Sequence, residues 1–310
     1  MSFKPLKFSV IIPTYNRPGR LEQCLHSLTR LHYPSDRFEV VVVDDGSQMS
    51  LTSITEQFEA DLSLRLIQQH NAGPASARNT GAAAAQGDYL IFTDDDCQPD
   101  PGWLKALDTA IADVPNALIG GHSVNALPDN VYSTASQLLI DYIYDYYNQT
   151  QGEATFLASN NFAMPRALYQ QLGGFDTRFP LAAGEDREFC DRWRHHGLPM
   201  HYAPAMRLNH AHQLTLASFW RQHFNYGRGA FHFHTVRSHR ESQPIRVEPL
   251  SFYVRLLTYP FSRQQGGRAF RLSGLFFLSQ VANVADFAWE KRKWPVAYMG
   301  ANVSGRYLSR

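Results

Sequence analysis

The sequence has little cysteine and lacks the segments that mark secretion or membrane insertion. Three cysteines stand far apart in 310 residues, with no CxxC pair; they are Cys24, Cys97 and Cys190. An odd, scattered set predicts neither a disulfide framework nor a thiolate zinc site. The first residues lack the apolar stretch of a signal peptide. The most apolar late segment, residues 272–289, contains polar side chains that a spanning helix would leave in hydrocarbon. We therefore predict a cytoplasmic protein.

Several common nucleotide-binding motifs are absent as well. The sequence has no GxGxxG loop for a dinucleotide-dependent oxidoreductase and no GxxxxGK[ST] loop for a nucleoside triphosphatase. The formal net charge is +1, and no run of basic residues could follow a phosphate backbone, so we expect no nucleic-acid partner. Apolar residues make up 44% of the chain, which is enough to bury a sizeable core.

The first half of the sequence alternates short apolar runs with segments whose apolar residues follow helical spacing. Runs rich in Val and Ile predict strands over residues 8–12, 38–43, 64–68 and 89–93. Helical patterns lie near residues 21–31, 51–58, 75–85 and 103–112. This alternation predicts a Rossmann-like, doubly wound and mostly parallel sheet. Later segments predict a strand over 156–164, helices over 165–171 and from 185, and a mostly helical remainder.

Polar or acidic loops follow three of the predicted strands, at residues 13–16, 44–47 and 94–96. Ligands of open α/β sheets bind beyond the carboxyl ends of the strands, where these loops would meet. Five carboxylates at one edge repel each other unless a cation or donors lie among them, and residues 94–96 suit Mg²⁺ or Mn²⁺. The alternative is that each aspartate caps a turn or helix. The rigid Pro13 and aromatic Tyr15 suit a flat base.

Two further patterns carry candidate chemistry. Asp186 shares a helix face with Phe189, Cys190 and Trp193, so burial would raise its pKa while the helix N-terminus opposes that change. Such a carboxylate suits a general base, and the alternative is an acid in the first turn that only complements the helix dipole. In His210-Ala211-His212 both imidazoles would share one face of an extended strand, as metal ligands or as a pair at the surface or core edge.

Together these residues resemble the family 2 glycosyltransferases, which have the GT-A fold. The ordered motifs are Val-Ile-Ile-Pro-Thr-Tyr-Asn (10–16), Val-Val-Asp-Asp-Gly-Ser (42–47), Asn-Ala-Gly-Pro-Ala-Ser-Ala-Arg-Asn (71–79), Phe-Thr-Asp-Asp-Asp (92–96), Gly-Gly-Phe-Asp (173–176) and Gly-Glu-Asp (184–186). Their order and spacing match over roughly residues 8 to 212, and no family motif follows residue 215.

The resemblance implies where a nucleotide sugar would lie. Asp45 would accept a hydrogen bond from a pyrimidine base, in a pocket lined by Pro13 and Tyr15. Asp95 would contact the ribose, and Gly173–Gly174 would let the backbone approach the donor sugar. The other residues implied on the nucleotide side are Thr14, Asn16, Arg78, Asn79 and Asp94.

It also implies a reaction. Asp96 would bind the Mn²⁺ or Mg²⁺ that holds the diphosphate, and His210, or alternatively His212, would complete the metal shell. Asp186 would be the base, supported by Glu185, and a single displacement would invert the anomeric configuration.

We therefore predict a GT-A catalytic domain over residues 1–215, with the nucleotide sugar in 1–115 and the acceptor and catalytic part in 116–215, and a helical region over 216–310. The expected function is transfer from a nucleotide diphosphate donor, UDP-linked, to a saccharide or lipid-linked acceptor in polysaccharide or glycoconjugate synthesis. The alternatives are a sugar nucleotidyltransferase and a non-catalytic nucleotide-sugar-binding module.

The C-terminal region interleaves aromatic and basic residues. Aromatic-rich helices with basic flanks can lie in an anionic membrane interface, here at the inner face of the cell membrane. The alternative is packing on the catalytic domain or on a partner chain in a homo-oligomer. The residues concerned are Phe252, Leu256, Leu257, Arg263, Arg268, Phe270, Arg271, Phe276, Phe277, Trp289, Lys291, Arg292 and Lys293.

Overall fold

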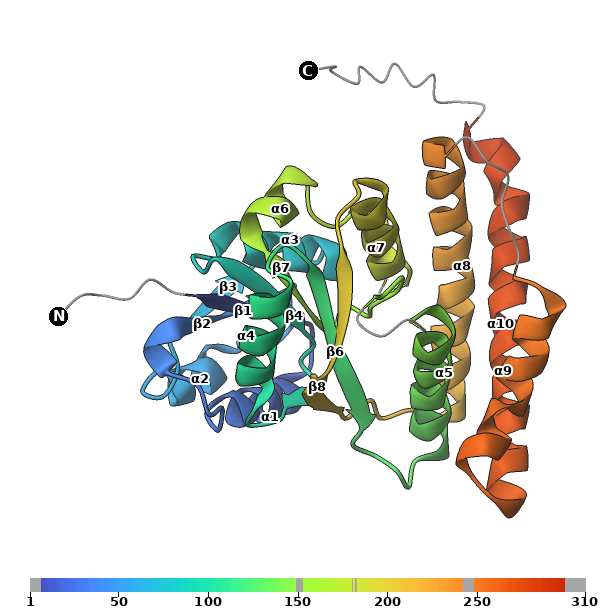
Figure 1. The fold of residues 1–310 in the computed structure, drawn as a ribbon, viewed down its shortest axis with the longest axis horizontal. Coiled ribbons are helices and arrows are strands. Elements are labelled where there is room, and N and C mark those ends of the chain that lie inside the picture. Colours follow the sequence, from blue (N-terminus) through green and yellow to red (C-terminus); the bar gives the residue numbers. More distant parts are fainter. Residues whose placement is uncertain (1–6, 149–152, 180, 182, 242–247, 299–310) are drawn as a thin grey trace.

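The apolar runs of the first half form the centre of a sheet with helices on both faces (Figure 1). The computed structural model describes residues 7–148, 153–179, 181, 183–241 and 248–298. The strands are β1 (Phe8–Thr14), β2 (Phe38–Asp44), β3 (Leu64–Gln68), β4 (Tyr89–Thr93), β5 (Cys97–Pro99), β6 (Leu118–Asn125), β7 (Asn161–Pro165) and β8 (Met200–His210). The helices are α1 (Pro18–Leu28), η1 (Ser35–Arg37), α2 (Thr52–Thr55), η2 (Glu56–Phe58), α3 (Pro74–Ala84), α4 (Trp103–Asp113), α5 (Val131–Tyr147), α6 (Arg166–Gln171), α7 (Glu185–His195), α8 (Leu216–Glu241), α9 (Leu250–Arg263) and α10 (Gly266–Tyr298).

The strand order across the described sheet is β3-β2-β1-β4-β7-β6-β8-β5. The strands β3, β2, β1 and β4 pair in parallel, as do β6 and β8, while β7 and β5 run antiparallel to their neighbours. The prediction of a mostly parallel α/β sheet of GT-A type, followed by a helical C-terminal region, is therefore confirmed. The carboxyl ends of β1, β2 and β4 lie at one edge, which is where the three polar loops begin.

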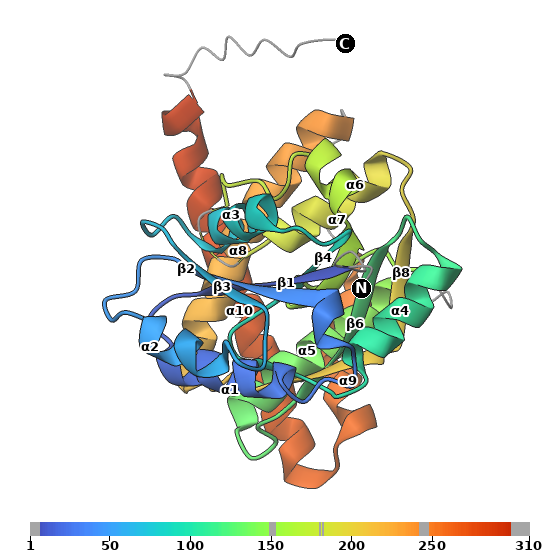
Figure 2. The ribbon, with the colours of Figure 1, turned by 90° about the vertical axis from the view of Figure 1, so that its left-hand side faces the viewer.

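Alternate residues of the central strands face two separate cores. Val10 and Ile12 of β1 pack with α1 and α4 on one side of the sheet, whereas Ile11 packs with α3 and α7 on the other. Figure 2 shows α3, α6 and α7 above the sheet and α1 and α2 below it. Because both faces are covered, these strands read as continuous apolar runs rather than as an alternation of apolar and polar residues.

The sequence patterns missed β5, β6, β8 and α5. Gly120 and Gly121 interrupt the apolar run at the start of β6, and polar residues follow them. The predicted strand over 156–164 begins later, at Asn161. The side chain of Asn148 donates to the carbonyl of Phe156 at 3.0 Å, and this contact helps to hold the segment before β7 in a loop.

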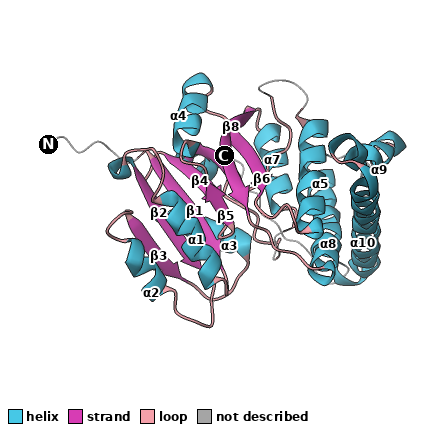
Figure 3. Ribbon diagram, turned by 90° about the horizontal axis from the view of Figure 1, so that it is seen from below, coloured by secondary structure: helices cyan, strands magenta, loops and turns pink. Residues whose placement is uncertain are grey.

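Three long helices follow β8 and stand beside the sheet (Figures 1 and 3). Glycines let α8 approach its neighbours closely. A Cβ at Gly227 would lie 2.1 Å from the carbonyl oxygen of Asn283 on α10, and one at Gly229 would lie 2.1 Å from that of Ala183, just before α7. The position of α8 is thus set by backbone contact on two sides. Among the described residues, no helix has the length and apolar character needed to cross a membrane.

His223 of α8 provides a test of this packing. Its ring is 3% exposed, lies 4.3 Å from the ring of Phe219, and its Nε2 has no partner among the described residues. Burial lowers the pKa of His223 to about 3, against about 6.5 in an unfolded chain. Protonation therefore favours the unfolded chain, so the contribution of His223 to stability is complete above pH 6.5 and declines as the pH falls below it.

We expect the free energy of unfolding, relative to that of His223→Leu, to fall by about 2 kcal/mol between pH 6.5 and pH 5. Urea titrations at several pH values measure this difference. His239→Leu, which alters an exposed ring on the same helix, should follow the wild type in parallel. If the unfolding free energy of His223→Leu also ran parallel to that of the wild type over this pH range, the ring would not be buried in its neutral form.

Candidate active site

Asp95 lies in the loop after β4 and is tied to the loop after β1. Its Oδ2 accepts a hydrogen bond from Oγ1 of Thr14 at 2.8 Å, and its Oδ1 accepts from Nη1 of Arg17 at 3.2 Å. Burial raises the pKa of Asp95 to about 6, although the charge of Arg17 and the Thr14 hydroxyl oppose this. The loops after two parallel strands therefore meet at the sheet edge, as their order predicts.

Asp96 joins the same loop to the end of β8. Its Oδ2 accepts from Nη1 of Arg20 at 2.9 Å, and its Oδ1 lies 3.2 Å from Nε2 of His210. Burial alone would raise the pKa of Asp96, but the charge and hydrogen bond of His210 hold it well below its usual range. Asp96 therefore stays ionised, although it is only 6% exposed.

The residues around Asp96 fit a divalent cation. One ligand atom each from Asp96, Cys97 and His210 lies within 4.8 Å of the others. Burial raises the pKa of the Cys97 thiol well above its usual value, so this sulfur stays protonated and is a poor ligand. The remaining carboxylate oxygen and imidazole nitrogen suit Mn²⁺ or Mg²⁺, with other positions left for water and phosphate oxygens. The ring of His212 stacks on His210 at 5.1 Å.

Arg78 connects the acidic loop to the start of α7. Its guanidinium is buried, with Nη1 donating to Oε1 of Glu185 at 2.9 Å and Nη2 donating to Oδ1 of Asp94 at 2.8 Å. It lies 5.5 Å from the centre of the Phe175 ring. We predicted Arg78 only as a neighbour of the nucleotide, and this bridge was missed. The sequence feature that could have indicated this bridge is an arginine within an alanine-rich helix that faces the sheet.

Asp186 occupies the first turn of α7, behind Gly184 in the left-handed conformation (φ +88°). The backbone N–H of Arg187 donates to Oδ1 of Asp186 at 2.7 Å. Burial raises the pKa of Asp186, against the opposing backbone hydrogen bond of Arg187. Burial also raises the pKa of Glu185, and the charge of Asp186 adds to this effect while Arg78 opposes it. The predicted balance at this helix end is therefore present.

The side chain of Asn79 binds the backbone of the Gly-Gly-Phe loop and does not point into an open space. Its Oδ1 accepts from the N–H of Phe175 at 2.9 Å, and its Nδ2 donates to the carbonyl of the same residue at 2.9 Å. Gly174 has φ +71°, and a Cβ there would lie 2.7 Å from that Oδ1. Gly173 also has a positive φ, +82°, but a Cβ there would meet nothing within 4 Å. Close packing on Asn79 therefore requires a glycine at position 174.

The loops after β1 and β2 form the other end of the site. The side chain of Asn16, at φ +55°, accepts from the N–H of Gln48, and its own N–H donates to Oγ of Ser47, both at 2.8 Å. Tyr15 is 46% exposed beside this contact, so its ring is available to a flat ligand. These contacts hold the two loops together.

Asp45 organises the loop that precedes α3. It is 4% exposed, and its Oδ1 accepts from Nε2 of Gln69 at 2.7 Å and from the N–H of Ala72 at 2.9 Å. Its Oδ2 accepts from the N–H of Gly73 at 2.9 Å. Among the described residues, this is the one hydrogen bond that Oδ2 is shown to accept, and the contact with a base stays a prediction.

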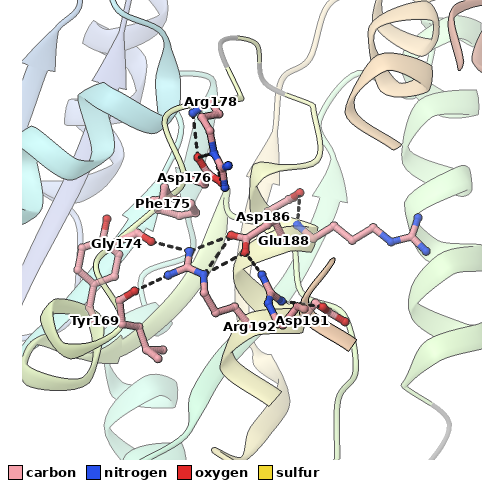
Figure 4. Close-up of polar contacts among 12 residues, drawn as sticks. Tyr169, Gly174, Phe175, Asp176, Arg178, Asp186, Glu188, Asp191 and Arg192 are labelled. Carbon is pink, nitrogen blue, oxygen red and sulfur yellow. Dashed lines mark hydrogen bonds and ion pairs between the residues drawn. The ribbon is translucent and has the colours of Figure 1, made fainter. Parts of the chain in front are cut away.

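A chain of ion pairs extends from the Gly-Gly-Phe loop through α7 to α8 (Figure 4). Nη2 of Arg192 donates to the carbonyl of Gly174 at 2.7 Å and to Oε2 of Glu188 at 2.8 Å. Arg240, near the end of α8, pairs with Glu188 and donates to Oδ2 of Asp191 at 2.8 Å. Sequence patterns gave no indication of this network, because its members lie on helices whose packing is decided by the tertiary structure.

Comparisons with known proteins indicate a family for the chain. The sequence profile described as "Glycosyl transferase family 2" matches residues 9–173. The chain is similar to "Glycosyltransferase AglE" of Haloferax volcanii, with 30% identity over 202 residues that cover 63% of this chain. The chain spans 64% of that relative's length.

Two solved structures are similar in fold. "Mannosyltransferase PcManGT from Pyrobaculum calidifontis in complex with GDP-Man and Mn2+" has a TM-score of 0.62 at 18% identity, covering 94% of this chain and 90% of that one. S. aureus TarS 1-349 in complex with UDP-GlcNAc has a TM-score of 0.54 at 18% identity, covering 94% and 92%.

Removing the Arg78 side chain tests the bridge. Arg78→Met leaves Glu185 buried without its cation, so we expect a loss of about 3–5 kcal/mol in unfolding free energy at pH 8. Because the folded-state pKa of Glu185 is raised, its carboxyl group is mostly uncharged at pH 5 and becomes charged as the pH rises through that pKa. The loss of the Arg78 cation costs more when Glu185 is charged, so the loss of unfolding free energy should be smaller at pH 5 than at pH 8. Urea denaturation at both pH values measures it. Arg263→Met, which removes an ion pair with Asp145 in which both side chains are more than half exposed, should cost less than about 1 kcal/mol. Equal losses in the two variants would contradict the bridge.

Proposed function

The chain belongs to glycosyl transferase family 2, and from this membership we propose that it transfers a sugar from a nucleotide diphosphate donor to an acceptor hydroxyl. We propose UDP as the donor nucleotide, a divalent cation as cofactor, inversion at the anomeric carbon, and a saccharide or lipid-linked acceptor. The one observation that carries the proposal is the bridge of Arg78, which joins the acidic loop after β4 to Glu185, the neighbour of Asp186.

Two similar structures support a nucleotide sugar as donor. One is described as a complex with UDP-GlcNAc and the other as a complex with GDP-Man and Mn²⁺. The proposed donor site of this chain runs from Tyr15 and Asp45 at the base end to Asp95 and Asp96 at the diphosphate end. A bound cation would neutralise negative charge on the leaving diphosphate. Asp96 and His210 are the residues that would hold it, since their oxygen and nitrogen face each other at 3.2 Å.

The remaining steps belong to groups of this chain. Tyr15 would stack on the base, and Asp95, kept in place by Thr14 and Arg17, would accept from the ribose. Asp186 would accept the proton of the acceptor hydroxyl as its oxygen attacks the anomeric carbon. Its raised pKa makes it a stronger base than an exposed aspartate, while the neighbouring backbone N–H favours its charged form.

The cation site predicts a defined binding defect. Asp96→Ala removes the only carboxylate of the Asp96–His210 pair, so the enhancement of UDP binding by Mn²⁺ should disappear. Calorimetric titration of UDP with Mn²⁺ and with EDTA measures this enhancement. Asp113→Ala, which alters an exposed carboxylate at the end of α4, should retain it. A Mn²⁺ enhancement that survives in Asp96→Ala would refute the assignment.

The base predicts a kinetic defect without a binding defect. Asp186→Asn keeps the size and the helix position but removes the proton acceptor, so transfer should fall by about 10²–10⁴-fold while UDP and Mn²⁺ affinities stay unchanged. Turnover of a panel of nucleotide sugars, measured with calorimetry on the same preparation, tests this. Asp113→Asn makes the same change at an exposed carboxylate of α4 and should turn over normally.

The outcomes also separate the competing functions. Near-normal turnover in Asp186→Asn would leave Asp186 with only the role of a first-turn acid, worth about 0.3–1 kcal/mol of stability. Release of pyrophosphate from a nucleoside triphosphate would indicate a sugar nucleotidyltransferase instead. Binding of nucleotide sugars with neither transfer nor hydrolysis in the wild type would indicate a non-catalytic module.

A further inference from the structure

The helices α9 and α10 present a broad set of exposed apolar side chains. Their exposed fractions are Leu250 79%, Val254 55%, Phe261 45%, Phe270 70%, Phe277 61%, Val281 40%, Val284 65% and Trp289 54%. We call these eight residues the apolar face. Soluble monomers rarely expose large apolar side chains in such groups, and groups of this kind mark interaction surfaces.

The apolar face has helical order. Phe270, Phe277 and Val284 follow each other at intervals of seven residues on α10, and no charged residue occurs between positions 272 and 285. The opposite side of the helix is buried, with Leu272 and Phe276 fully enclosed against α5 and α9. The helix is therefore apolar both toward the protein and away from it.

The face extends over two helices. Phe261 of α9 and Phe270 of α10 contact each other edge to face, with ring centres 5.0 Å apart. Figures 1 and 3 show α9 and α10 at the outside of the molecule, at the end away from β3. The surface is thus wider than the single seam by which two helices form a coiled coil.

The exposed charges on α9 and α10 themselves have one sign, and among the described residues Arg263 alone of them pairs with an exposed acid of a neighbouring helix, Asp145 of α5. Between residues 250 and 293, every charged side chain that is classed as exposed is basic; these are Arg255, Arg263, Arg268, Arg271, Lys291, Arg292 and Lys293. The two acids of α10 face α8, and Glu290 also lies 3.3 Å from Nζ of Lys293. Asp286 is buried and Glu290 is only 13% exposed, and both lie close to the guanidinium of Arg228 on α8.

This charge pattern decides between two occupants. A second copy of the chain could cover the apolar face with its own α10. However, basic residues flank α10 at both ends, so a parallel or an antiparallel pair would place cations beside cations. An anionic lipid surface instead accepts aromatic side chains below its headgroups and attracts the basic flanks.

We propose that the apolar face docks this protein on an anionic membrane surface, with α9 and α10 lying in the interface. Phe270 and Phe277 enter the lipid, while Arg268, Arg271 and the basic cluster at 291–293 contact the headgroups. This inference does not rest on the proposed reaction, and its test needs no activity measurement.

Sedimentation with vesicles tests the proposal. The full chain should bind vesicles in which phosphatidylglycerol replaces part of the phosphatidylcholine, and salt should weaken binding. Phosphatidylcholine alone should bind far less. Phe270→Ser/Phe277→Ser should lower the partition coefficient at least about tenfold. Arg268→Gln/Arg271→Gln should lower it several-fold and reduce its dependence on salt.

Two controls keep the result interpretable. Met49→Ser removes an apolar side chain that is 68% exposed in the loop between β2 and α2, far from α9 and α10 (Figure 1), and should bind vesicles like the wild type. Because the altered side chains are exposed, each variant should melt like the wild type, and a thermal melting curve checks that it is folded.

Three results would overturn the proposal. They are absence of vesicle binding at low salt, equal binding to neutral vesicles, and unchanged binding by Phe270→Ser/Phe277→Ser. Analytical ultracentrifugation identifies the alternative occupant. A wild-type dimer that this double variant dissociates, without vesicle binding, would assign the apolar face to a second copy of the chain.

Discussion

The structure depends on one buried cation. Arg78 places its guanidinium between Asp94 and Glu185, and so joins α3, the loop after β4 and the start of α7. Burial of a charge is costly unless partners satisfy it, and here both guanidinium ends have a carboxylate. The same contact lets Glu185 and Asp186 lie next to each other at a helix start, because one of the two negative charges is compensated.

The acidic sheet edge follows the same principle. Asp95 and Asp96 are almost completely buried, and each meets an arginine from the segment after β1, namely Arg17 and Arg20. The two environments nevertheless give these carboxyl groups different pKa values, because burial raises the pKa of Asp95 whereas His210 lowers that of Asp96. Such a separation suits different tasks, a hydrogen-bonding group for a ribose and a charged ligand for a cation.

The C-terminal helices connect the site to the outer surface. Close contacts at Gly227 and Gly229 hold α8 between α10 and the segment before α7. Arg240 pairs with Glu188, the acid of α7 that also binds Arg192 beside the Gly-Gly-Phe loop. Packed contacts therefore connect α9 and α10, through α8, to the helix that carries Asp186.

Local patterns were sufficient for the features that depend on neighbours in the chain. The apolar runs of β1 to β4, the three polar loops at their ends and the buried face of α7 all follow from periodicity and order along the chain. Strand β6 escaped detection because glycines and polar side chains hide its period, and its partners Ala163 and Met200 are distant in sequence. Likewise, the family resemblance predicts Arg78 and Asn79 near the nucleotide, but only the tertiary structure shows that Arg78 pairs with Glu185, 107 residues away, and that Asn79 bonds to Phe175. Hydrogen bonds and ion pairs over such separations are decided by how helices and strands pack, which no local window of sequence contains.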